Sequence, residues 1–177
     1  MNAAERLFLD KGIEATTIDD IARGADVAKG TFYLHFPNKS GLVEALRDRF
    51  VRRILDGIEA DVAGMNQGDW RGRLTAWSKA CCEGYFDAAR LHHLVFVAAP
   101  PPTRDGLADN ILIEDLAALL ERGMRAKAWN LKDPPFTATF LFNALHGLVQ
   151  QPRADAESRR RLMDAIAEHF LRIVGRP

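Results

Sequence analysis

The stretch DVAKGTFYLHFPNKSGL, residues 26–42, combines cationic and aromatic side chains at close spacing. The side chains with this chemistry are Lys29, Phe32, Tyr33, His35, Phe36 and Lys39. No carboxylate occurs between Asp26 and Glu44, although the 177-residue chain has 24 acidic and 24 basic residues and no net charge. Because carboxylates would repel phosphate groups, this local pattern predicts a patch that binds a polyanion in an otherwise balanced protein.

Two short helices joined by a tight turn must position these side chains. TTIDDIARGADVA predicts a helix with Thr17 as its N-cap and Asp20 three residues later, which is a capping-box pattern. A second helix is predicted over about residues 28–34. The turn between them contains Asp26, and aspartate tolerates a positive φ better than most residues do. This arrangement predicts a helix-turn-helix, whose second helix enters the major groove of DNA.

The second helix is predicted to have one buried and one exposed face. Ala28, Phe32 and Phe36 recur every four residues and are expected to pack inward. The outward residues expected to lie near base edges are Lys29, Gly30, Thr31 and Leu34. A glycine lets the backbone come close to the groove, a threonine offers a hydroxyl and a methyl group, and a lysine can reach guanine or phosphate.

Three further side chains have donors at the height of the DNA phosphates. Tyr33 and His35 lie at the end of the second helix, and Lys39 begins the next one, where the positive helix end also attracts phosphate. The arginines at positions 47, 49, 52 and 53 could add phosphate contacts, but a solvated helix face is the favoured interpretation.

These segments resemble the N-terminal domain of the TetR family of bacterial transcriptional regulators. The resemblance covers residues 3–46, through AAERLFLDKGIE and ATTIDDIARGADVAKGTFYLHFPNKSGLVEAL, and T-F-Y-x-H-F-x-N-K is its most specific part. Asp26 stands where the family usually has glycine, and Ala28 replaces a frequent serine. The chain also begins directly at the first helix, without the basic arm of many relatives.

The resemblance implies an all-α homodimer that acts as a repressor and leaves its double-stranded operator DNA when a small molecule binds. A helix-turn-helix domain at residues 1–46 would continue through a long helix, 38–63, into a ligand-binding and dimerisation domain at 47–177. By position, the resemblance gives DNA-binding roles to Thr17, Lys29, Gly30, Thr31, Tyr33, Leu34, His35 and Lys39.

The remaining helices are predicted from periodicity and helix-ending residues. Asn2 with Glu5 suggests a capping box for the first helix, and Asn38 is the expected cap of the long fourth helix. The composition changes at residues 64–72. Further helices are expected from about Trp70 and over about 89–99, 105–129, 136–151 and 155–175. Pro100, Pro101 and Pro102 are expected to end the second of these.

A stripe of apolar side chains in the second region could line a pocket or form plain core. The candidate ligand-binding residues are Trp77, Cys81, Tyr85, Phe86, Phe96, Met124, Phe140 and His146. A pocket with this lining would favour a hydrophobic or aromatic effector.

The last two helices are apolar on more than one face, whereas a surface helix needs only one such face. The extra face could be buried within one subunit or by a second copy of the chain. The candidate dimerisation residues are Leu141, Leu145, Leu148, Leu162, Met163, Ile166, Phe170 and Ile173.

Other classes of function find less support. The adjacent Cys81 and Cys82 suggest reduced thiols in a cytoplasmic protein, and sensing of oxidants or metals by them is the weaker interpretation. No signal peptide or membrane span is expected, and no metal or cofactor. Enzyme motifs such as HExxH and GxSxG do not occur, so a helix-bundle enzyme has no positive support. A further alternative is a protein-interaction partner that has lost operator binding.

Overall fold

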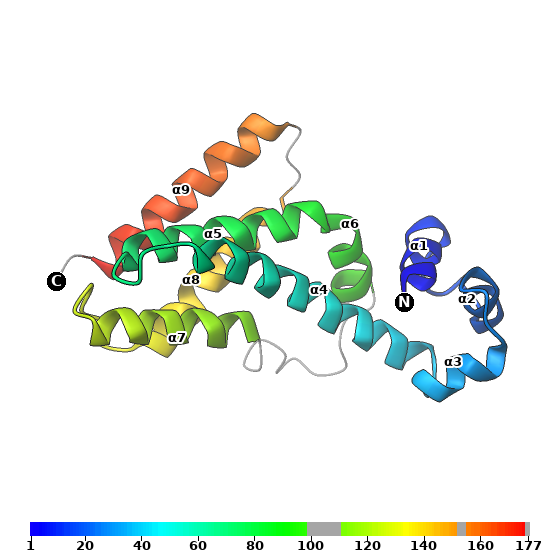
Figure 1. Ribbon diagram of the computed structural model, residues 1–177. Helices are drawn as coiled ribbons and strands as arrows, with labels where there is room; N and C mark the ends of the chain where they lie inside the picture. Colours follow the sequence, from blue (N-terminus) through cyan, green and yellow to red (C-terminus); the bar gives the residue numbers. More distant parts are fainter. Residues whose placement is uncertain (99–110, 152–154, 176–177) are drawn as a thin grey trace. The chain divides into compact units, whose positions relative to one another are not determined.

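The computed structural model describes residues 1–98, 111–151 and 155–175, and all regular secondary structure in these ranges is helical (Figure 1). The helices in chain order are α1 (Asn2–Lys11), α2 (Ile18–Gly24), α3 (Lys29–His35), α4 (Lys39–Ala63), α5 (Trp70–Asp87), α6 (Ala89–His92), the π-helix η1 (His93–Ala98), α7 (Ile111–Arg125), α8 (Pro134–Val149) and α9 (Ala156–Val174). The predicted all-α class is confirmed. None of the described helices is long and apolar enough to cross a membrane.

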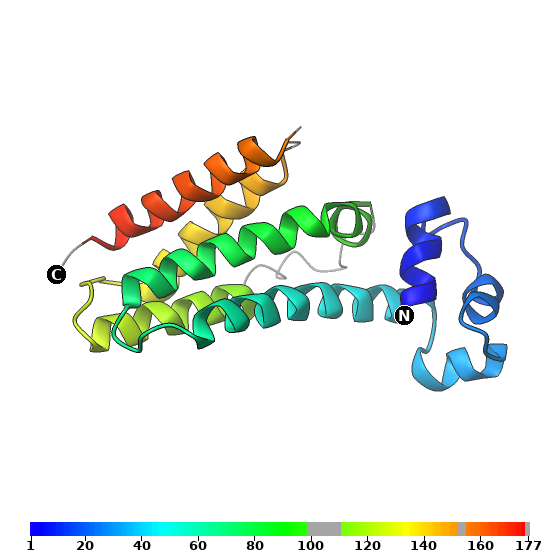
Figure 2. The same ribbon diagram turned by 45° about the horizontal axis from the view of Figure 1, so that its top comes forward.

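The chain divides into two compact units, and the division falls inside α4, after Arg52. The first unit contains residues 1–52 and 88–98, and the second contains residues 53–87, 111–151 and 155–175. In the second unit α9 runs alongside α5, and α7 runs alongside α8, as the two ribbon views show (Figures 1 and 2). The domain boundary expected at residues 46 and 47 stays a prediction.

The first unit buries apolar side chains from each of its first four helices. Phe8, Ile21, Phe32, Leu46 and Phe50 are at most 5% exposed. Removing such side chains from water is the main contribution to the stability of this small unit.

The predicted capping box of the first helix is wrong. Asn2 is already helical, Met1 is the N-cap, and no side chain caps this end. The Asn2 and Glu5 side chains are occupied elsewhere, because Arg49 of α4 donates to Asn2 Oδ1 at 2.7 Å and forms an ion pair with Glu5. Two polar residues with capping spacing thus join α1 to α4 instead.

The segment that follows α5 belongs to the first unit, where it packs on α1 and α4. Arg47 Nε donates to the Val95 carbonyl at 2.7 Å, and Arg90 Nη2 donates to the Leu9 carbonyl at 3.1 Å. The Phe50 ring lies 5.4 Å from the His92 ring between centroids. The helix expected over 89–99 is therefore present as α6 followed by η1, and the prolines expected to end it lie outside the described residues.

The second unit confirms the apolar stripe of α5. Leu74, Trp77, Cys81 and Tyr85 are buried, whereas Trp70 at the start of the stripe is half-buried. The helix expected over 105–129 is described from Ile111 onward, and it ends at Arg125 rather than at residue 129.

The chain reverses after α7 so that Trp129 folds back on that helix. Lys127 has φ 59°, and Trp129 Nε1 donates to the Leu120 carbonyl at 2.8 Å. The indole covers Gly123, where only a glycine leaves room for the ring. Burying the indole with its N–H bonded explains why the helix stops early.

The last two helices begin at aspartate caps. Asp133 Oδ1 accepts from the Phe136 amide at 2.9 Å, and Asp155 Oδ1 accepts from the Ser158 amide at 2.7 Å. Each carboxylate satisfies an amide that has no partner within its helix.

Candidate nucleic-acid interface

The N-terminus of α2 is held by the predicted capping box. The Asp20 amide donates to Thr17 Oγ1, and the Thr17 amide donates to Asp20 Oδ2, both at 3.1 Å. Asp20 also accepts from Lys11 and Arg23 at 2.6 Å each. The hydrogen bond from Lys11, followed by those with Thr17, lowers the pKa of the Asp20 carboxyl far below its ordinary value. Asp20 therefore remains ionised and fixes the start of the helix-turn-helix.

The turn between α2 and α3 has the geometry that the sequence suggested. Asp26 has φ 55°, and its amide donates to the Arg23 carbonyl at 3.2 Å. The Val27 amide donates to the Ala22 carbonyl at 3.0 Å. These two bonds form a Schellman motif, in which glycine is the preferred residue at the left-handed position.

Replacing Asp26 by glycine is expected to stabilise the protein by about 0.5–1 kcal/mol, because glycine adopts positive φ without the steric cost of a Cβ atom. Urea unfolding followed by circular dichroism measures this change in the free energy of unfolding. The matched control is Asp10→Gly inside α1, which should destabilise the protein. A destabilising effect of Asp26→Gly would contradict this account of the turn.

Helix α3 has a buried side as predicted, with one correction. Phe32 is 5% exposed and Phe36 is half-buried, and their ring centroids lie 5.6 Å apart. The prediction that Ala28 packs inward is wrong, because Ala28 is exposed as the N-cap of α3. An N-cap residue precedes the helical turn, so the spacing of four residues does not place it on the buried face.

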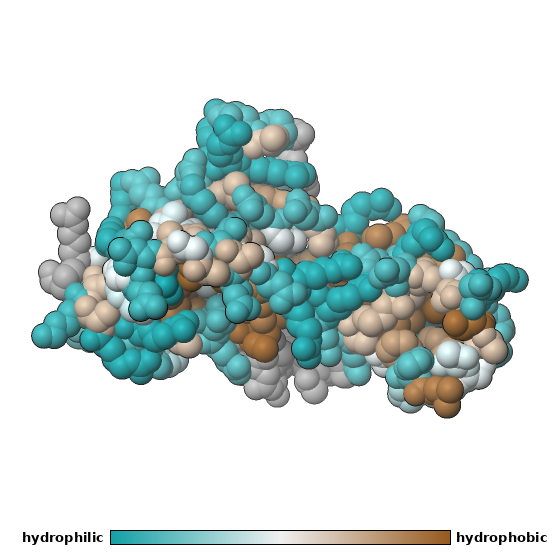
Figure 3. Space-filling model, viewed as in Figure 1, coloured by the Kyte–Doolittle hydropathy of each residue, from teal (hydrophilic) through white to brown (hydrophobic). Residues whose placement is uncertain are grey.

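The other side of α3 faces solvent. Leu34 is 83% exposed and Tyr33 is 51% exposed, and the Tyr33 ring is held edge-on against Phe32 at 5.4 Å between centroids. Lys29, Gly30 and His35 are also exposed, whereas Thr31 is half-buried. Hydrophobic surface is visible over α3 in the space-filling view (lower right in Figure 3). Such an exposed leucine on a short polar helix is available for apolar contact with a thymine methyl group.

Gly30 is not required by the fold. A Cβ atom built at this position would meet no other atom within 4 Å, and the backbone of α3 is helical there. Glycine lowers the stability of a helix, and any residue could occupy this open position. The fold itself therefore gives no reason for a glycine here. The missing side chain leaves the backbone of α3 accessible from solvent.

Lys29 has a partner that its sequence position did not reveal. Its Nζ lies 3.0 Å from Asp19 Oδ2, and both side chains are more than half exposed. The hydrogen bond and charge of Asp19 raise the pKa of Lys29 above its ordinary value. An exposed ion pair of this kind contributes little to stability and is readily exchanged for another anion.

Lys39 occupies a more enclosed position than the sequence suggested. Its Nζ donates to the carbonyls of Ile13, Thr16 and Glu14 at 2.7, 3.2 and 3.3 Å. The ammonium group thus holds the loop between α1 and α2, and its role in phosphate contact stays a prediction. The predicted cap of α4 by Asn38 is confirmed, because Asn38 Oδ1 accepts from the Gly41 amide at 2.9 Å.

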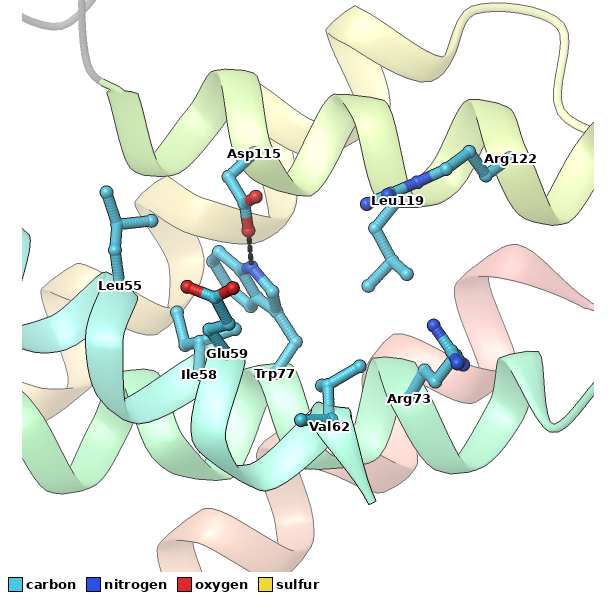
Figure 4. Close-up of a pocket in the computed structure, with 10 residues that line it drawn as sticks. Leu55, Ile58, Glu59, Val62, Arg73, Trp77, Asp115, Leu119 and Arg122 are labelled. Carbon is cyan, nitrogen blue, oxygen red and sulfur yellow. Dashed lines mark hydrogen bonds between the residues drawn. The ribbon is translucent and has the colours of Figure 1, made fainter. Parts of the chain in front are cut away.

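The second unit contains a cavity of about 520 Å³ between α4, α5 and α7 (Figure 4). Its lining residues are Leu55, Ile58, Glu59, Val62, Ala63, Arg73, Trp77, Asp115, Leu119 and Arg122. Trp77 is the member of this lining that belongs to the predicted ligand-binding set. Its Nε1 donates to Asp115 Oδ2 at 2.7 Å, drawn as a dashed line in Figure 4.

The other predicted ligand-binding residues are not among those that line this cavity. Cys81 and Tyr85 are buried, Phe86, Met124 and His146 are half-buried, and Phe140 is 55% exposed. Phe96 belongs to the first unit. Their assignment was based on an apolar stripe, and a stripe of that kind also forms the core that supports a cavity.

The predicted dimerisation residues divide by exposure. Leu141, Leu145, Ile166 and Phe170 are buried within the protomer, and Leu162 and Met163 are half-buried, whereas Leu148 is 38% and Ile173 is 45% exposed. The sequence did not assign Phe136 to this surface, and it assigned Phe140 to the pocket. Phe136, Phe140, Ala144 and Leu148 follow one another at steps of four along the exposed side of α8.

Both cysteines are buried free thiols. Burial raises the pKa of the Cys82 thiol to about 12 and raises that of Cys81 well above its ordinary value. With these raised pKa values, both thiols are protonated near neutral pH. They are therefore unreactive, because the thiolate is the reactive form. Within the described residues, no cluster of three histidine, cysteine or carboxylate side chains could hold a metal ion.

The cysteines are expected to react with Ellman's reagent at least about tenfold more slowly in the folded protein than in urea. Raising the pH from 7 to 9 should accelerate the reaction of the unfolded chain, whose thiols titrate in this range. The folded protein should react more slowly than the unfolded chain at both pH values, because its thiols are buried and their pKa values are raised. Fast labelling of the native protein at neutral pH would contradict the buried assignment.

The described architecture places the chain among helix-turn-helix proteins. Residues 1–46 match the family model described as bacterial regulatory proteins, tetR family. The chain is 50% identical over 48 residues to the transcriptional regulator TtgR of Pseudomonas putida, covering 27% of this chain and 23% of TtgR. It is 34% identical over 64 residues to the transcriptional regulator YvdT of Bacillus subtilis, covering 36% of this chain and 33% of YvdT.

The whole fold is similar to that of solved structures. The fatty acid degradation regulator FadR from Bacillus halodurans superposes with a TM-score of 0.74 at 19% identity, over 96% of this chain and 94% of that one. Residues 1–46 are therefore similar to the N-terminal domain of the tetR family of bacterial regulatory proteins. The relatives TtgR and YvdT are transcriptional regulators, as expected for a chain that is not an enzyme.

Proposed function

We propose that the chain is a homodimeric repressor that binds double-stranded operator DNA and is released by a small molecule. The observation that carries the DNA-binding part is the exposed side of α3, where Lys29, Gly30, Tyr33 and Leu34 face solvent. No carboxylate occurs within α3 or at its two flanking residues. Such a repressor works in the bacterial cytoplasm, where promoter DNA is found.

The exposed residues have complementary roles in this proposal. Leu34 and Thr31 contact bases, and Lys29 exchanges Asp19 for a guanine edge or a phosphate. Tyr33, His35 and the capping hydroxyl of Thr17 donate to phosphates, which orient the protein on the duplex. Lys39 contributes its positive charge while holding the loop at residues 13–16 in place.

The test is fluorescence anisotropy on a duplex selected from random sequences by the wild-type protein. We expect selective binding over a scrambled duplex, with an affinity that falls as salt concentration rises. Leu34→Ala and Lys29→Ala should alter base preference, whereas Tyr33→Phe should weaken binding to all sequences alike. Binding that does not distinguish the selected duplex from the scramble would favour the alternative, a TetR-like protein that has lost operator binding.

The apolar stripe on α8 supports the dimer. Phe136 is 68% and Phe140 is 55% exposed, and Leu148 continues the same stripe. Contiguous exposed apolar side chains favour association, and Ile173 on α9 adds a further one. A symmetric pairing would bury these side chains against their copies and place two α3 helices on one duplex.

Phe140→Arg is expected to convert the dimer into a folded monomer, because each interface would bury two unpaired charges. Analytical ultracentrifugation at micromolar concentration measures the mass, and circular dichroism confirms that helices remain. The matched control Glu121→Arg, on an exposed position of α7, should leave the dimer intact. A wild-type protein that sediments as a monomer would overturn the dimer proposal.

The cavity in the second unit supports the response to a small molecule. Its volume lies within the usual range for ligand sites, and its lining combines apolar side chains with a few polar groups. Helix α4 contributes to this lining and also supplies buried residues of the first unit, including Leu46 and Phe50. A ligand that shifts α4 therefore acts on an element shared by both units.

A further inference from the structure

The charged residues of the cavity carry information about the ligand. Two carboxylates, Glu59 and Asp115, and two guanidinium groups, Arg73 and Arg122, line the same space. The sequence predicted a hydrophobic or aromatic effector, which accounts for Leu55, Ile58, Val62 and Leu119 but for none of these charges. Glu59 and Arg122 are exposed and Arg73 and Asp115 are half-buried, so these four side chains are accessible to a ligand that enters the cavity.

These charges are not paired with one another. Among the described residues, neither carboxylate forms an ion pair, and Asp115 accepts the neutral N–H of Trp77. Arg73 donates to the Asn66 carbonyl at 3.4 Å and lies over the Trp70 ring, and Arg122 donates to the Ala118 carbonyl at 3.2 Å. Each guanidinium has five N–H donors, so most of its capacity remains available.

The acidic and basic groups occupy opposite ends of the cavity. Along α7, Asp115 precedes Leu119 by one turn and Arg122 by about two turns, or ~10 Å along the helix axis. Along α5, Arg73 precedes Trp77 by one turn, ~6 Å. Since α5 and α7 run in opposite directions, both arginines lie on the same side of the bonded Trp77–Asp115 pair (Figures 1 and 4).

Figure 4 shows the resulting polarity directly. The Glu59 carboxylate is drawn on the side of Asp115 and the Trp77 indole, whereas Arg73 and Arg122 are drawn on the other side. Leu119 and Val62 project between the two ends. Two carboxylates at one end favour an organic cation, and two guanidinium groups at the other end favour a carboxylate or a similar anion.

From this arrangement we infer that the effector is a zwitterionic amphiphile, with an amine and an acidic group at opposite ends of an apolar body. The amine would lie between Asp115 and Glu59, and the acid would lie between Arg73 and Arg122. The two charged groups of the ligand would be about 6–10 Å apart, the span from one to two helical turns. This inference rests on the proposed function of the cavity as an effector site.

The test uses three probes with the same eight-carbon chain: ω-aminooctanoate, octanoate and octylamine. The extended ω-aminooctanoate places its charges about as far apart as two helical turns. Isothermal titration calorimetry on the full-length protein without DNA should show that ω-aminooctanoate binds at least tenfold more tightly than either singly charged probe. Equal or tighter binding of octanoate or octylamine, or no binding of ω-aminooctanoate at low millimolar concentration, would overturn the inference.

Two variants assign the ends of the ligand. Asp115→Asn keeps an acceptor for the Trp77 N–H, and it should weaken ω-aminooctanoate and octylamine at least fivefold while leaving octanoate unchanged or tighter. Arg122→Gln should weaken ω-aminooctanoate and octanoate and spare octylamine. The control Glu114→Gln, one residue from Asp115 on α7 and outside the lining, should change none of the three. Variants that affect all probes equally would overturn the polarity.

The failure of this inference can be told apart from a failure of the proposed function. Operator binding by the ligand-free protein is measured separately. If the protein binds DNA but prefers octanoate, the proposed function stands and the zwitterionic ligand class is refuted. If ω-aminooctanoate binds as expected but leaves the anisotropy of bound operator unchanged, the ligand class stands and release by this ligand is refuted.

Discussion

Gly30→Ala is expected to reduce affinity for a selected operator by about 10- to 100-fold while leaving the fold intact. The new methyl group would extend from the solvent-facing side of α3, where nothing within 4 Å opposes it in the protein itself. In the complex it would hold the helix away from the groove floor and weaken base contacts worth about 1–3 kcal/mol each. The free energy of unfolding should rise slightly, because alanine is the better helix former.

Anisotropy on the selected duplex and urea unfolding together measure these opposite effects. The matched control is Gly57→Ala on α4, where a Cβ atom also meets nothing within 4 Å. It should stabilise the helix by about 1 kcal/mol and leave operator affinity unchanged. Equal operator binding by Gly30→Ala and the wild type would remove the base-facing assignment of this part of α3.

Gly123→Ala is expected to destabilise the protein by about 3–5 kcal/mol. A Cβ atom at Gly123 would lie 2.0 Å from the Trp129 ring, so the indole would have to leave its site. Trp129 is 2% exposed and donates to the Leu120 carbonyl, so its displacement loses buried apolar area and leaves a void. Losses of this size are typical when a large aromatic side chain is removed from a core.

Urea unfolding measures this loss, and a double-mutant cycle with Trp129→Ala tests its cause. In the Trp129→Ala background, the cost of Gly123→Ala should nearly disappear, because no ring remains to collide with the methyl group. The Gly57→Ala variant again supplies a control for the intrinsic effect of alanine in a helix. If the cost of Gly123→Ala were the same in both backgrounds, the close approach of Trp129 would not be its cause.

Local patterns in the sequence determined the helix-turn-helix. The Thr17–Asp20 capping box, the positive φ of Asp26 and the cap at Asn38 all depend on atoms a few residues apart. The all-helical class follows from the periodic spacing of apolar residues. This spacing indicates which side of a helix is buried, even when the element that packs against it is unknown. The exposed side of α3 was predictable for the same reason, apart from Ala28 at its boundary.

Tertiary structure alone decided which polar groups meet across the chain. Lys39 with the residue 13–16 loop, Arg49 with Asn2 and Glu5, and Lys29 with Asp19 pair groups that are 10 to 47 residues apart. The periodicity of the sequence does not predict such pairs. A charged residue on a helix surface gives the same sequence pattern whether its side chain contacts water or a distant residue.

The cavity shows the same division most clearly. The sequence indicated an apolar stripe on α5 and correctly placed Trp77 on it, but Glu59, Asp115 and Arg122 belong to two other helices. Their convergence depends on how α4, α5 and α7 pack, which sets the rotation of each helix about its axis. Side-chain type and spacing therefore determined the helices and the exposed face of α3, whereas long-range packing determined which side chains line the cavity.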